Sequence, residues 1–504
     1  MVSARNWFVV GAVVLGGCTL KVGDLSDCKV DADCASKGAS LACVDGICVN
    51  ALPTADAGPD CDGGTCFACQ PSTFVQYLNA CTGSSDVCSA FDGSRVTLHL
   101  VDGGREPLPD VTDAGPVDAG PPVDAGPPVD AGLPLCGANG NPIVVLSGST
   151  ASVPFVSALG KALFNDTQPM TVVFQSLGSC IGVSDVLTGQ TIQGTGTFWD
   201  PESTNPGNAE TCLLPAPVVP DIAVSDVFPA TCSPLPNGLP SGFGESFGPV
   251  QTMTFVVPLA STQTSISAEA AYDVFGFGAQ SGVSPWTDPT HLFRRNSGSG
   301  TQNMIGVAIG LPAARFQGID CGSSTGVKTR VTDGGEPEAT LGIVGDTDVD
   351  ATALQSMRVL AYQHDSQSCG YLPDSAAGKR DKLNVRDGHY TIWGPLHFLT
   401  KLGTDGYAFN HNAQRLLDYI TGVQLPPGGL DLIQVEADNN LVPTCAMHVT
   451  RSEEVGPYAS PMVNNPCNCR FEFDATQATS CTTCTGAADC PSSAPHCSYG
   501  YCEP

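Results

Sequence analysis

The stretch RRNSGSGT, from Arg294 to Thr301, places two arginines directly before hydroxyl residues that are separated by glycines. Leu292 and Phe293 precede it, and a helix-like run follows from Gln302 to Leu311. This order predicts a strand-to-helix junction, where backbone N–H groups are unpaired and the helix dipole favours an anion. An arginine fork and hydroxyl donors suit a tetrahedral oxyanion. The stretch therefore predicts an anion site; a flexible polar loop is the alternative, because Gly and Ser are common in turns.

Three further segments end an apolar run on polar residues. They are LSGSTASVPF (Leu146–Phe155), FQSLGSCIGV (Phe174–Val183) and DIAVSDVFP (Asp221–Pro229). With four such motifs in this order, the chain from about Asn141 to about Gly422 resembles the phosphate-binding protein of the bacterial high-affinity phosphate ABC transporter, a type II periplasmic binding protein. The resemblance implies a two-lobed α/β fold and a possible ABC permease as partner. The ligand positions it implies for phosphate are Thr150, Ser179, Asp226, Arg295, Ser299, Gly300 and Thr301.

The sequence also departs from the family pattern. Cys180 follows Ser179 where the family has a small residue without sulfur, and Ala151 replaces a bulkier apolar residue. An insertion that carries a cysteine, Pro201–Pro220, interrupts the first lobe. These differences leave the expected fold unchanged but bear on the strength of ligand binding.

Short apolar runs alternate with helix-like runs through this region, which is typical of α/β architecture. We expect a crossing into the second lobe at Thr252–Val257, a helix at Ser267–Gly276 and a return to the first lobe near Thr340–Val344. The segment Asn384–Phe398 resembles the closing segment of the family. Because ligands of open α/β sheets bind at the carboxyl ends of strands, the four motifs would meet between two lobes that close around an anion.

Length and charge limit the possible functions. At 504 residues the chain is too long for one hydrophobic core, so two or more domains are expected. Its net charge of −29 argues against nucleic acid and anionic membrane surfaces as partners. A phosphate ligand remains compatible, because a buried site acts at short range and distant charge is screened over about 8–10 Å. The 24 cysteines indicate an oxidising compartment.

The first residues have the features of an export signal. Arg5 gives a positive start, the apolar run Trp7–Gly17 is too short to span a bilayer, and LGGC (Leu15–Cys18) resembles a lipoprotein cleavage box. We expect the mature protein to begin at Cys18 with lipid attached. It would then be anchored in the cell envelope, on the periplasmic side or at the outer-membrane or cell surface. An ordinary signal peptide with a coincidental cysteine is the alternative.

Two short segments look like copies of one module. Cysteines 28, 34, 43 and 48 are spaced C-x5-C-x8-C-x4-C, and cysteines 484, 490, 497 and 502 are spaced C-x5-C-x6-C-x4-C. An aspartate precedes the second cysteine in both segments. Each segment is too short for a hydrophobic core, which predicts two disulfides in each. A zinc site is the alternative, although exported thiols oxidise and the first module has no histidine.

A further cysteine cluster and a tether lie between the first module and the two-lobed region. CFAC, Cys66–Cys69, has redox spacing, but no βαβ pattern surrounds it, so a structural disulfide is predicted. Without Cys18 the cysteine count is 23, so at least one thiol is free or intermolecular. The stretch Asp110–Leu133 repeats Val-Asp-Ala-Gly-Pro-Pro, which favours an extended polyproline tether.

Other constellations predict no catalysis and no metal. GESFG, Gly244–Gly248, matches a hydrolase elbow but lacks the flanking strand and helix that this motif needs. GDTDVDA, Gly345–Ala351, begins like a calcium loop but lacks its glycine and its bidentate glutamate. Three histidines, His389, His397 and His411, have no metal-ligand spacing and are expected to be structural.

The sequence thus predicts an extracytoplasmic, lipid-anchored solute-binding protein for an oxyanion, with phosphate as the expected ligand, no cofactor and no enzymatic activity. The alternative is a surface interaction or structural lipoprotein that retains the fold without a transport role. The expected organisation is a lipoprotein signal peptide (1–18), a small disulfide-rich module (19–50), a second cysteine-rich segment (51–109), a tether (110–134), the two-lobed domain (135–430), a cysteine-containing appendage (431–480) and a C-terminal disulfide-rich module (481–504).

Overall fold

The structure is a computed structural model, and it describes only part of the chain. The described residues are 41–44, 47–50, 66–83, 89–96, 99–101, 104–111, 132–202, 209–233, 235, 238–349, 352–461, 463 and 465–504. They belong to two compact units: Met1–Ala57 with Leu98–Pro107, and Gly58–Thr97 with Leu108–Pro504. Cys18, with its predicted lipid, and most of the predicted tether lie outside the described residues.

The smaller unit contains two antiparallel strand pairs. β1 (Leu41–Val44) pairs with β2 (Ile47–Asn50), and β3 (Leu100–Val101) pairs with β4 (Gly104–Arg105). In the first pair Cys43 and Cys48 are opposite each other in register. Cys28 and Cys34 lie outside the described residues, so the two disulfides expected in this module stay a prediction.

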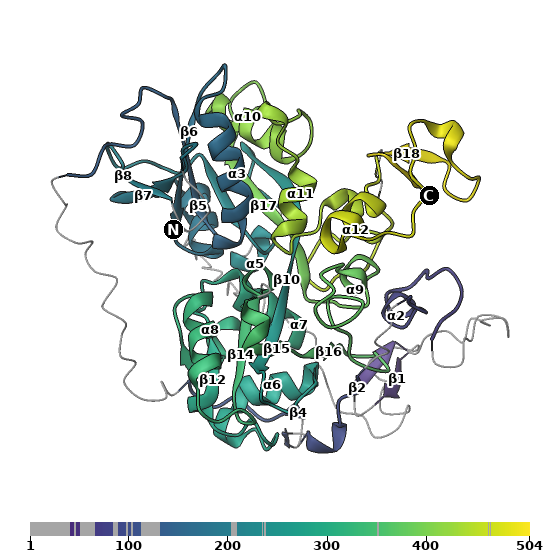
Figure 1. Cartoon of the computed structure of the whole chain (residues 1–504). Coiled ribbons are helices and arrows are strands. Elements are labelled where there is room, and N and C mark those ends of the chain that lie inside the picture. The colour runs from purple at the N-terminus through teal and green to yellow at the C-terminus, as the bar shows by residue number, and fades with distance from the viewer. Residues whose placement is uncertain are drawn as a thin grey trace, which may run out of the picture. The chain divides into compact units, whose positions relative to one another are not determined.

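The larger unit is organised around one long strand, β10 (Phe243–Pro258), which runs from one lobe into the other (Figure 1). Its 16 residues can span roughly 50 Å at about 3.3 Å per residue. Its first part pairs with β17 (Trp393–Lys401), and Met253–Val256 pair with β14 (Leu341–Gly345). The predicted crossing at Thr252–Val257 is therefore confirmed.

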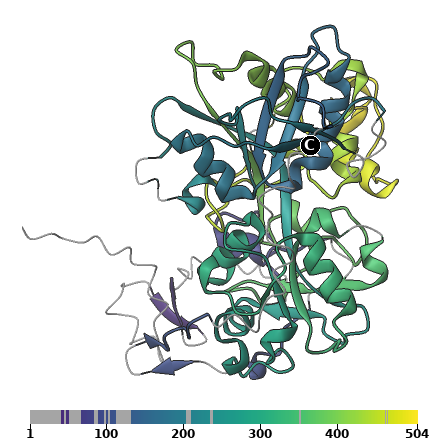
Figure 2. The same cartoon turned by 90° about the vertical axis from the view of Figure 1, so that its left-hand side faces the viewer.

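An 11-stranded mixed sheet continues on both sides of β10 (Figure 2). The strand order is β13-β12-β14-β10-β17-β9-β5-β6-β7-β8, and β15 also pairs with β10. The remaining strands of this sheet are β5 (Ile143–Gly148), β6 (Thr171–Ser176), β7 (Thr195–Phe198), β8 (Glu210–Leu213), β9 (Ile222–Ser225), β12 (Leu292–Arg294), β13 (Ile319–Asp320) and β15 (Met357–Val359).

In the first lobe, helices cover both faces of the sheet, and β9 shows why. Ile222 and Val224 pack into the core formed with α3 (Val153–Phe164) and α10 (His411–Ile420), whereas Ala223 packs against α4 (Ser179–Thr188) on the other face. Successive strand residues point to opposite faces, so a strand buried on both faces reads as a continuous apolar run.

The second lobe follows the same rule. On one face α6 (Ala268–Phe277) and α7 (Gly300–Ile309) pack against Phe255 of β10 and Ile343 of β14. On the other face α8 (Ser324–Asp333) packs against Val256 of β10 and Val344 of β14. The helix predicted at Ser267–Gly276 is confirmed as α6, with Ser267 as its N-cap through a hydrogen bond from the Ala270 N–H.

The predicted return to the first lobe is wrong in its position. The apolar run near Thr340–Val344 forms β14, which pairs in parallel with β12 and therefore stays in the second lobe. The chain returns only with β17, which pairs with β9. An apolar run predicts a buried strand but not its partner, because pairing is decided by residues far away in the sequence. The later segment Asn384–Phe398 contains α9 (Leu383–Arg386) and the start of β17.

The C-terminal region extends the larger unit. Val442 exchanges two backbone hydrogen bonds with Val250 of β10, so the residues after α11 (Leu432–Asp438) add to the main core. Two disulfides, Cys445–Cys467 and Cys469–Cys481, join this segment to α12 (Asn468–Thr476) and the loop beyond it. The last hairpin, β18 (His496–Ser498) with β19 (Tyr501–Glu503), carries Cys484–Cys497 and Cys490–Cys502. Two disulfides in the C-terminal module are thus confirmed.

Further short elements connect these parts. They are α2 (Phe74–Leu78), α5 (Pro229–Cys232) and the parallel pair β11 (Ser265–Ser267) and β16 (Ala361–Gln363). Near α2, Cys66 pairs with Cys81 and Cys69 is disulfide-bonded as well, which supports a structural role for the CFAC cysteines.

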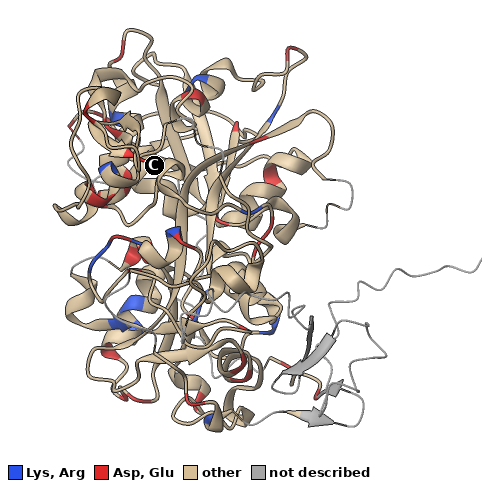
Figure 3. Ribbon diagram, turned by 90° about the vertical axis from the view of Figure 1, so that its right-hand side faces the viewer, with Lys and Arg blue, Asp and Glu red and all other residues tan. Residues whose placement is uncertain are grey.

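Acidic residues are scattered over helices and loops of both lobes (Figure 3). Among the described helices, none is long and apolar enough to cross a membrane.

Candidate functional site

A polar cavity of about 270 Å³ lies where the four sequence motifs meet. Each motif follows the carboxyl end of a strand: β5, β6, β9 and β12. Parallel pairing brings β5 beside both β6 and β9, whereas β12 belongs to the other lobe. All seven predicted ligand positions line this cavity: Thr150, Ser179, Asp226, Arg295, Ser299, Gly300 and Thr301. The tertiary structure therefore brings the predicted residues together, while their ligand stays a prediction.

Asp226 lies at the buried base of the cavity. Its Oδ1 accepts a hydrogen bond of 2.5 Å from Ser149 Oγ, and its Oδ2 accepts one of 3.3 Å from Ser179 Oγ. The side chain is 3% exposed, and burial raises the pKa of this carboxyl, although Ser149, Arg295 and Ser179 oppose that shift. Each carboxylate oxygen has two lone-pair sites, so Asp226 can still accept a proton that a ligand donates.

Two helices direct their N-termini into the cavity. Neither α4 nor α7 has a side-chain cap; the Cys180 N–H of α4 donates to Gly298 O at 3.3 Å, and other N–H groups of the two first turns are left for another acceptor. Gly300 begins α7 because a Cβ at this position would lie 2.4 Å from Ser179 Oγ and 2.5 Å from an Asp226 oxygen. Gly178 precedes α4 with a φ of +95°, which favours glycine.

Hydroxyl groups supply further donors. Within the described residues, no hydrogen bond is made by the side chains of Thr150, Ser299 or Thr301, although Ser299 and Thr301 are almost completely buried. Ser176 lines the same cavity at the end of β6. Hydroxyls that open onto the cavity without a protein partner are free to donate, so this arrangement suits a ligand rich in acceptor oxygens.

The two arginines of the central motif face different surroundings. Arg295 lines the cavity and donates from NH1 to Ser324 Oγ at 2.6 Å, while its buried Nε has no partner within the described residues. Burial lowers the pKa of Arg295, and Asp226 and Asp348 oppose that shift. Arg294 turns away from the cavity, donating to Gly318 O and pairing with Asp320 at 3.4 Å. Only Arg295 is therefore placed to contact a ligand.

The unexpected Cys180 has a structural explanation. It forms a disulfide with Cys232 that joins α4 to α5. Ser179 directly precedes Cys180, and Asp226 lies just before α5, so the disulfide braces the two segments that carry these site residues. The cysteine of the Pro201–Pro220 insertion, Cys212, pairs with Cys136 at the far edge of the sheet.

Sequence reasoning missed several cavity residues. Ser149 is the N-cap residue before Thr150 and holds Asp226, so the capping pattern in LSGST was a usable signal. Ser324 follows β13 in the stretch DCGSST, another strand-to-helix junction. Gln251 lies inside β10, where no local pattern marked it, and Asp348 belongs to GDTDVDA, which was considered only as a calcium loop.

The structure also locates other patterns that the sequence offered. GESFG lies inside β10, so Ser246 is not at a strand-to-helix turn. Within the described part of the chain, one group of side chains has metal-like spacing: Cys484, Cys490 and Cys502, all of which are disulfide-bonded. Among the described cysteines, Cys321 is a free thiol.

No protein-family model matches the chain, and no curated protein sequence does. An ABC-type phosphate transport receptor from Vibrio cholerae is 14% identical with a TM-score of 0.39, over 59% of this chain and 99% of that chain. A putative phosphate ABC transporter substrate-binding protein from Clostridium perfringens, with bound phosphate, is 13% identical with a TM-score of 0.40, over 60% and 99%. The reduced OxyR regulatory domain from Pseudomonas aeruginosa is 9% identical with a TM-score of 0.32, over 56% and 98%.

These similar structures are binding proteins and a regulatory domain. The described chain has an α/β fold with a large mixed sheet, and it carries disulfides that include those near the C-terminus.

Proposed function

We propose that this protein is an extracytoplasmic solute-binding protein whose cavity binds an oxyanion, and that the oxyanion is phosphate. The observation that carries the proposal is the convergence of donors in one cavity. Two uncapped helix N-termini, three hydroxyls without partners and the Arg295 guanidinium surround a space of about 270 Å³. Such donors stabilise tetrahedral anions through short, oriented hydrogen bonds.

Asp226 supports phosphate over sulfate. A buried carboxylate repels an anion unless the ligand has a proton to donate. Phosphate near neutral pH keeps such a proton, whereas sulfate has none and would leave two acceptors facing each other. A clash of this kind costs on the order of 1–3 kcal/mol, which gives selectivity by penalising the wrong ligand.

The test is calorimetric titration of the mature chain with phosphate and with sulfate. We expect phosphate to bind and sulfate to bind at least about tenfold more weakly, the equivalent of about 1.4 kcal/mol. Absence of phosphate binding would favour the alternative, a surface interaction or structural lipoprotein that kept the fold and lost its ligand. Equal binding of the two anions would leave an oxyanion site but remove the assignment to phosphate.

We also propose that lipid on Cys18 anchors the protein in the membrane and that a permease is its membrane partner. Several acyl chains anchor firmly, because each buried CH₂ adds about 0.8 kcal/mol. If Cys18 is the site of cleavage and lipidation, the Cys18→Ala variant should stay a larger precursor that carries no lipid, and this precursor should be found in the membrane fraction. Normal processing and release of this variant would show that Cys18 is not lipidated.

A further inference from the structure

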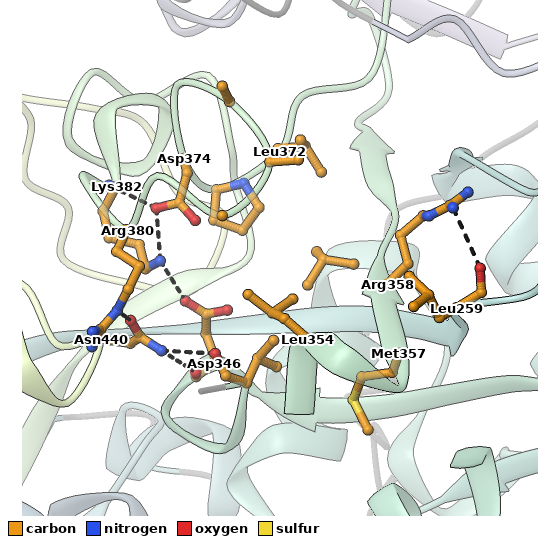
Figure 4. Close-up of a pocket in the computed structure, with 16 residues that line it drawn as sticks. Leu259, Asp346, Leu354, Met357, Arg358, Leu372, Asp374, Arg380, Lys382 and Asn440 are labelled. Atoms are coloured by element: carbon orange, nitrogen blue, oxygen red, sulfur yellow. Dashed lines mark hydrogen bonds and ion pairs between the residues drawn. The ribbon is translucent and has the colours of Figure 1, made fainter. Parts of the chain in front are cut away.

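A second cavity of about 280 Å³ lies in the larger unit, away from the four motifs. One side is apolar and formed by Leu259, Leu354, Met357 and Leu372. The other side carries Asp346, Asp374, Arg380 and Lys382 (Figure 4). Ligand pockets commonly combine apolar walls with a few polar groups at one end.

Lys382 is held between two carboxylates. Its Nζ lies 2.7 Å from Asp374 Oδ1 and 2.8 Å from Asp346 Oδ2, the second contact being an ion pair without hydrogen-bond alignment. The side chains of Lys382 and Asp346 are 2% and 4% exposed. The second oxygen of each carboxylate has no hydrogen-bond partner within the described residues, and in Figure 4 these oxygens face the space beside Leu354 and Leu372.

The polar end carries charges of both signs: two carboxylates, the Lys382 ammonium and the Arg380 guanidinium. Two carboxylates face one ammonium group, and Arg380 does not approach either carboxylate within ion-pair distance. Its guanidinium instead donates to Asn440 Oδ1 at 2.7 Å and to Asp438 O at 2.6 Å. Burial raises the pKa of Asp346, with Lys382 as the main opposing influence. Arg380 opposes the same pKa shift from a longer distance, so the two free carboxylate oxygens remain acceptors for a donor in the cavity.

Backbone strain is concentrated around the same cavity. Within the described residues, seven residues other than glycine have a positive φ, and three of them line this cavity: Arg380 at 64°, Lys382 at 48° and Asn440 at 58°. Strained residues of this kind persist where the surrounding contacts hold them, and they gather at ligand sites. Small residues, among them Ala376 and Gly378, also line the cavity on the loop between Asp374 and Arg380.

We propose that this cavity binds a small molecule that carries a primary ammonium group on an apolar body. The ammonium would donate to the unpartnered oxygens of Asp346 and Asp374, and the apolar body would pack against Leu354, Met357 and Leu372. Arg358, at the far end, donates to Ser261 O at 3.1 Å and disfavours the reversed orientation by repulsion. The net charge of −29 adds a general attraction for cations.

The test uses the mature full chain and three probes of the same length: hexylammonium, hexanol and hexanoate. Calorimetry is done with and without saturating phosphate, because an empty oxyanion cavity could itself take the hexanoate carboxylate. We expect hexylammonium to bind at millimolar concentration or below, and at least tenfold more tightly than hexanol or hexanoate. Failure of hexylammonium to bind, or equal binding of hexanol or hexanoate, would overturn the proposal.

Variants then locate the bound amine. Asp374→Asn keeps the shape of the side chain and should weaken hexylammonium binding at least tenfold, whereas Asp333→Asn, at an exposed aspartate outside the cavity, should not. Ala376→Trp should fill the cavity without changing its charges and should also weaken binding at least tenfold. The Ala376→Trp variant still tests the location of the bound amine if Asp374→Asn does not fold. Wild-type affinity in a folded Asp374→Asn or Ala376→Trp variant would place the amine elsewhere and contradict the proposal.

Discussion

The two cavities of the larger unit lie on the two sides of one short turn, Asp346–Asp348, and they are built in different ways. Asp348 lines the oxyanion cavity, whereas Asp346 lines the second cavity. Asn440 holds the turn by donating to the carbonyl oxygens of Asp346 and Val349. The first cavity consists of helix N-termini and hydroxyls at strand ends; the second consists of a buried ion cluster beside an apolar wall.

This difference has an energetic consequence. In the oxyanion cavity, the buried Arg295 Nε lacks a partner within the described residues, so the unliganded site is less stable than a fully paired one. In the second cavity, burial by itself lowers the pKa of Lys382, but Asp346 and Asp374 outweigh burial and hold this pKa above its usual value. Residues of the first cavity should therefore matter for ligand affinity, and Lys382 for stability.

The largest expected effect is on stability, at Lys382. Lys382→Met leaves two buried carboxylates without their cation, which should lower the free energy of unfolding by about 3–5 kcal/mol. Arg295→Met, in the oxyanion cavity, should change it by about 1 kcal/mol or less, because Arg295 makes one side-chain hydrogen bond within the described residues. Urea denaturation of both variants measures the contrast. Similar losses in the two variants would mean that the cavities do not differ in this way.

The second effect is on phosphate affinity. Arg295→Ala removes charge-assisted hydrogen bonds worth roughly 1.5–3 kcal/mol each, so the affinity should fall at least about tenfold. Arg294→Ala is the matched control, since Arg294 contacts Gly318 and Asp320 instead of the cavity. Calorimetry with phosphate distinguishes the two. If both variants lose the same affinity, or neither does, Arg295 is not the ligand arginine.

Asp226→Asn should have a smaller, two-sided effect. Burial raises the folded-state pKa of Asp226 above its unfolded value, so the stability of the unliganded protein falls as pH rises from the usual carboxyl range through that raised pKa. In Asp226→Asn this group no longer titrates, so the stability should not fall over this pH range. At neutral pH the free energy of unfolding of the variant should be higher by about 0.5–2 kcal/mol.

The same variant should reduce the preference for phosphate over sulfate, because an amide can donate to sulfate. Thermal unfolding at several pH values and titration with both anions measure the two consequences. A variant that keeps the full preference would leave Asp226 with a helix-terminal or structural role only.

The smallest expected effect concerns coupling between the cavities. Asn440 holds the shared turn through backbone carbonyls, so removing the charge of Asp374 should leave the turn in place. We expect Asp374→Asn to change phosphate affinity by no more than about twofold, the usual limit for sites without shared partners. A larger change, measured by the same calorimetry, would show that the turn transmits the state of one cavity to the other.

The sequence alone determined much of the oxyanion cavity. Strand-to-helix junctions are local, and a short run of apolar, glycine and hydroxyl residues is sufficient to predict one, so Thr150, Ser179 and the Arg295–Thr301 segment could be placed at strand ends. The short cysteine-rich module was predicted for the same kind of local reason, because so small a segment cannot bury a core and needs disulfides.

Only the tertiary structure decided the rest. β14 pairs with β12, which lies about 50 residues earlier in the chain. The local sequence does not show this pairing, which is why the predicted return to the first lobe was misplaced. Ser324 and Asp348 reach the first cavity from separate strand ends, and Lys382 meets Asp346 across a segment that contains β15 and β16. A buried ion cluster has no sequence signature. Its charges become unfavourable only when packing removes them from water, and that packing cannot be read from the sequence.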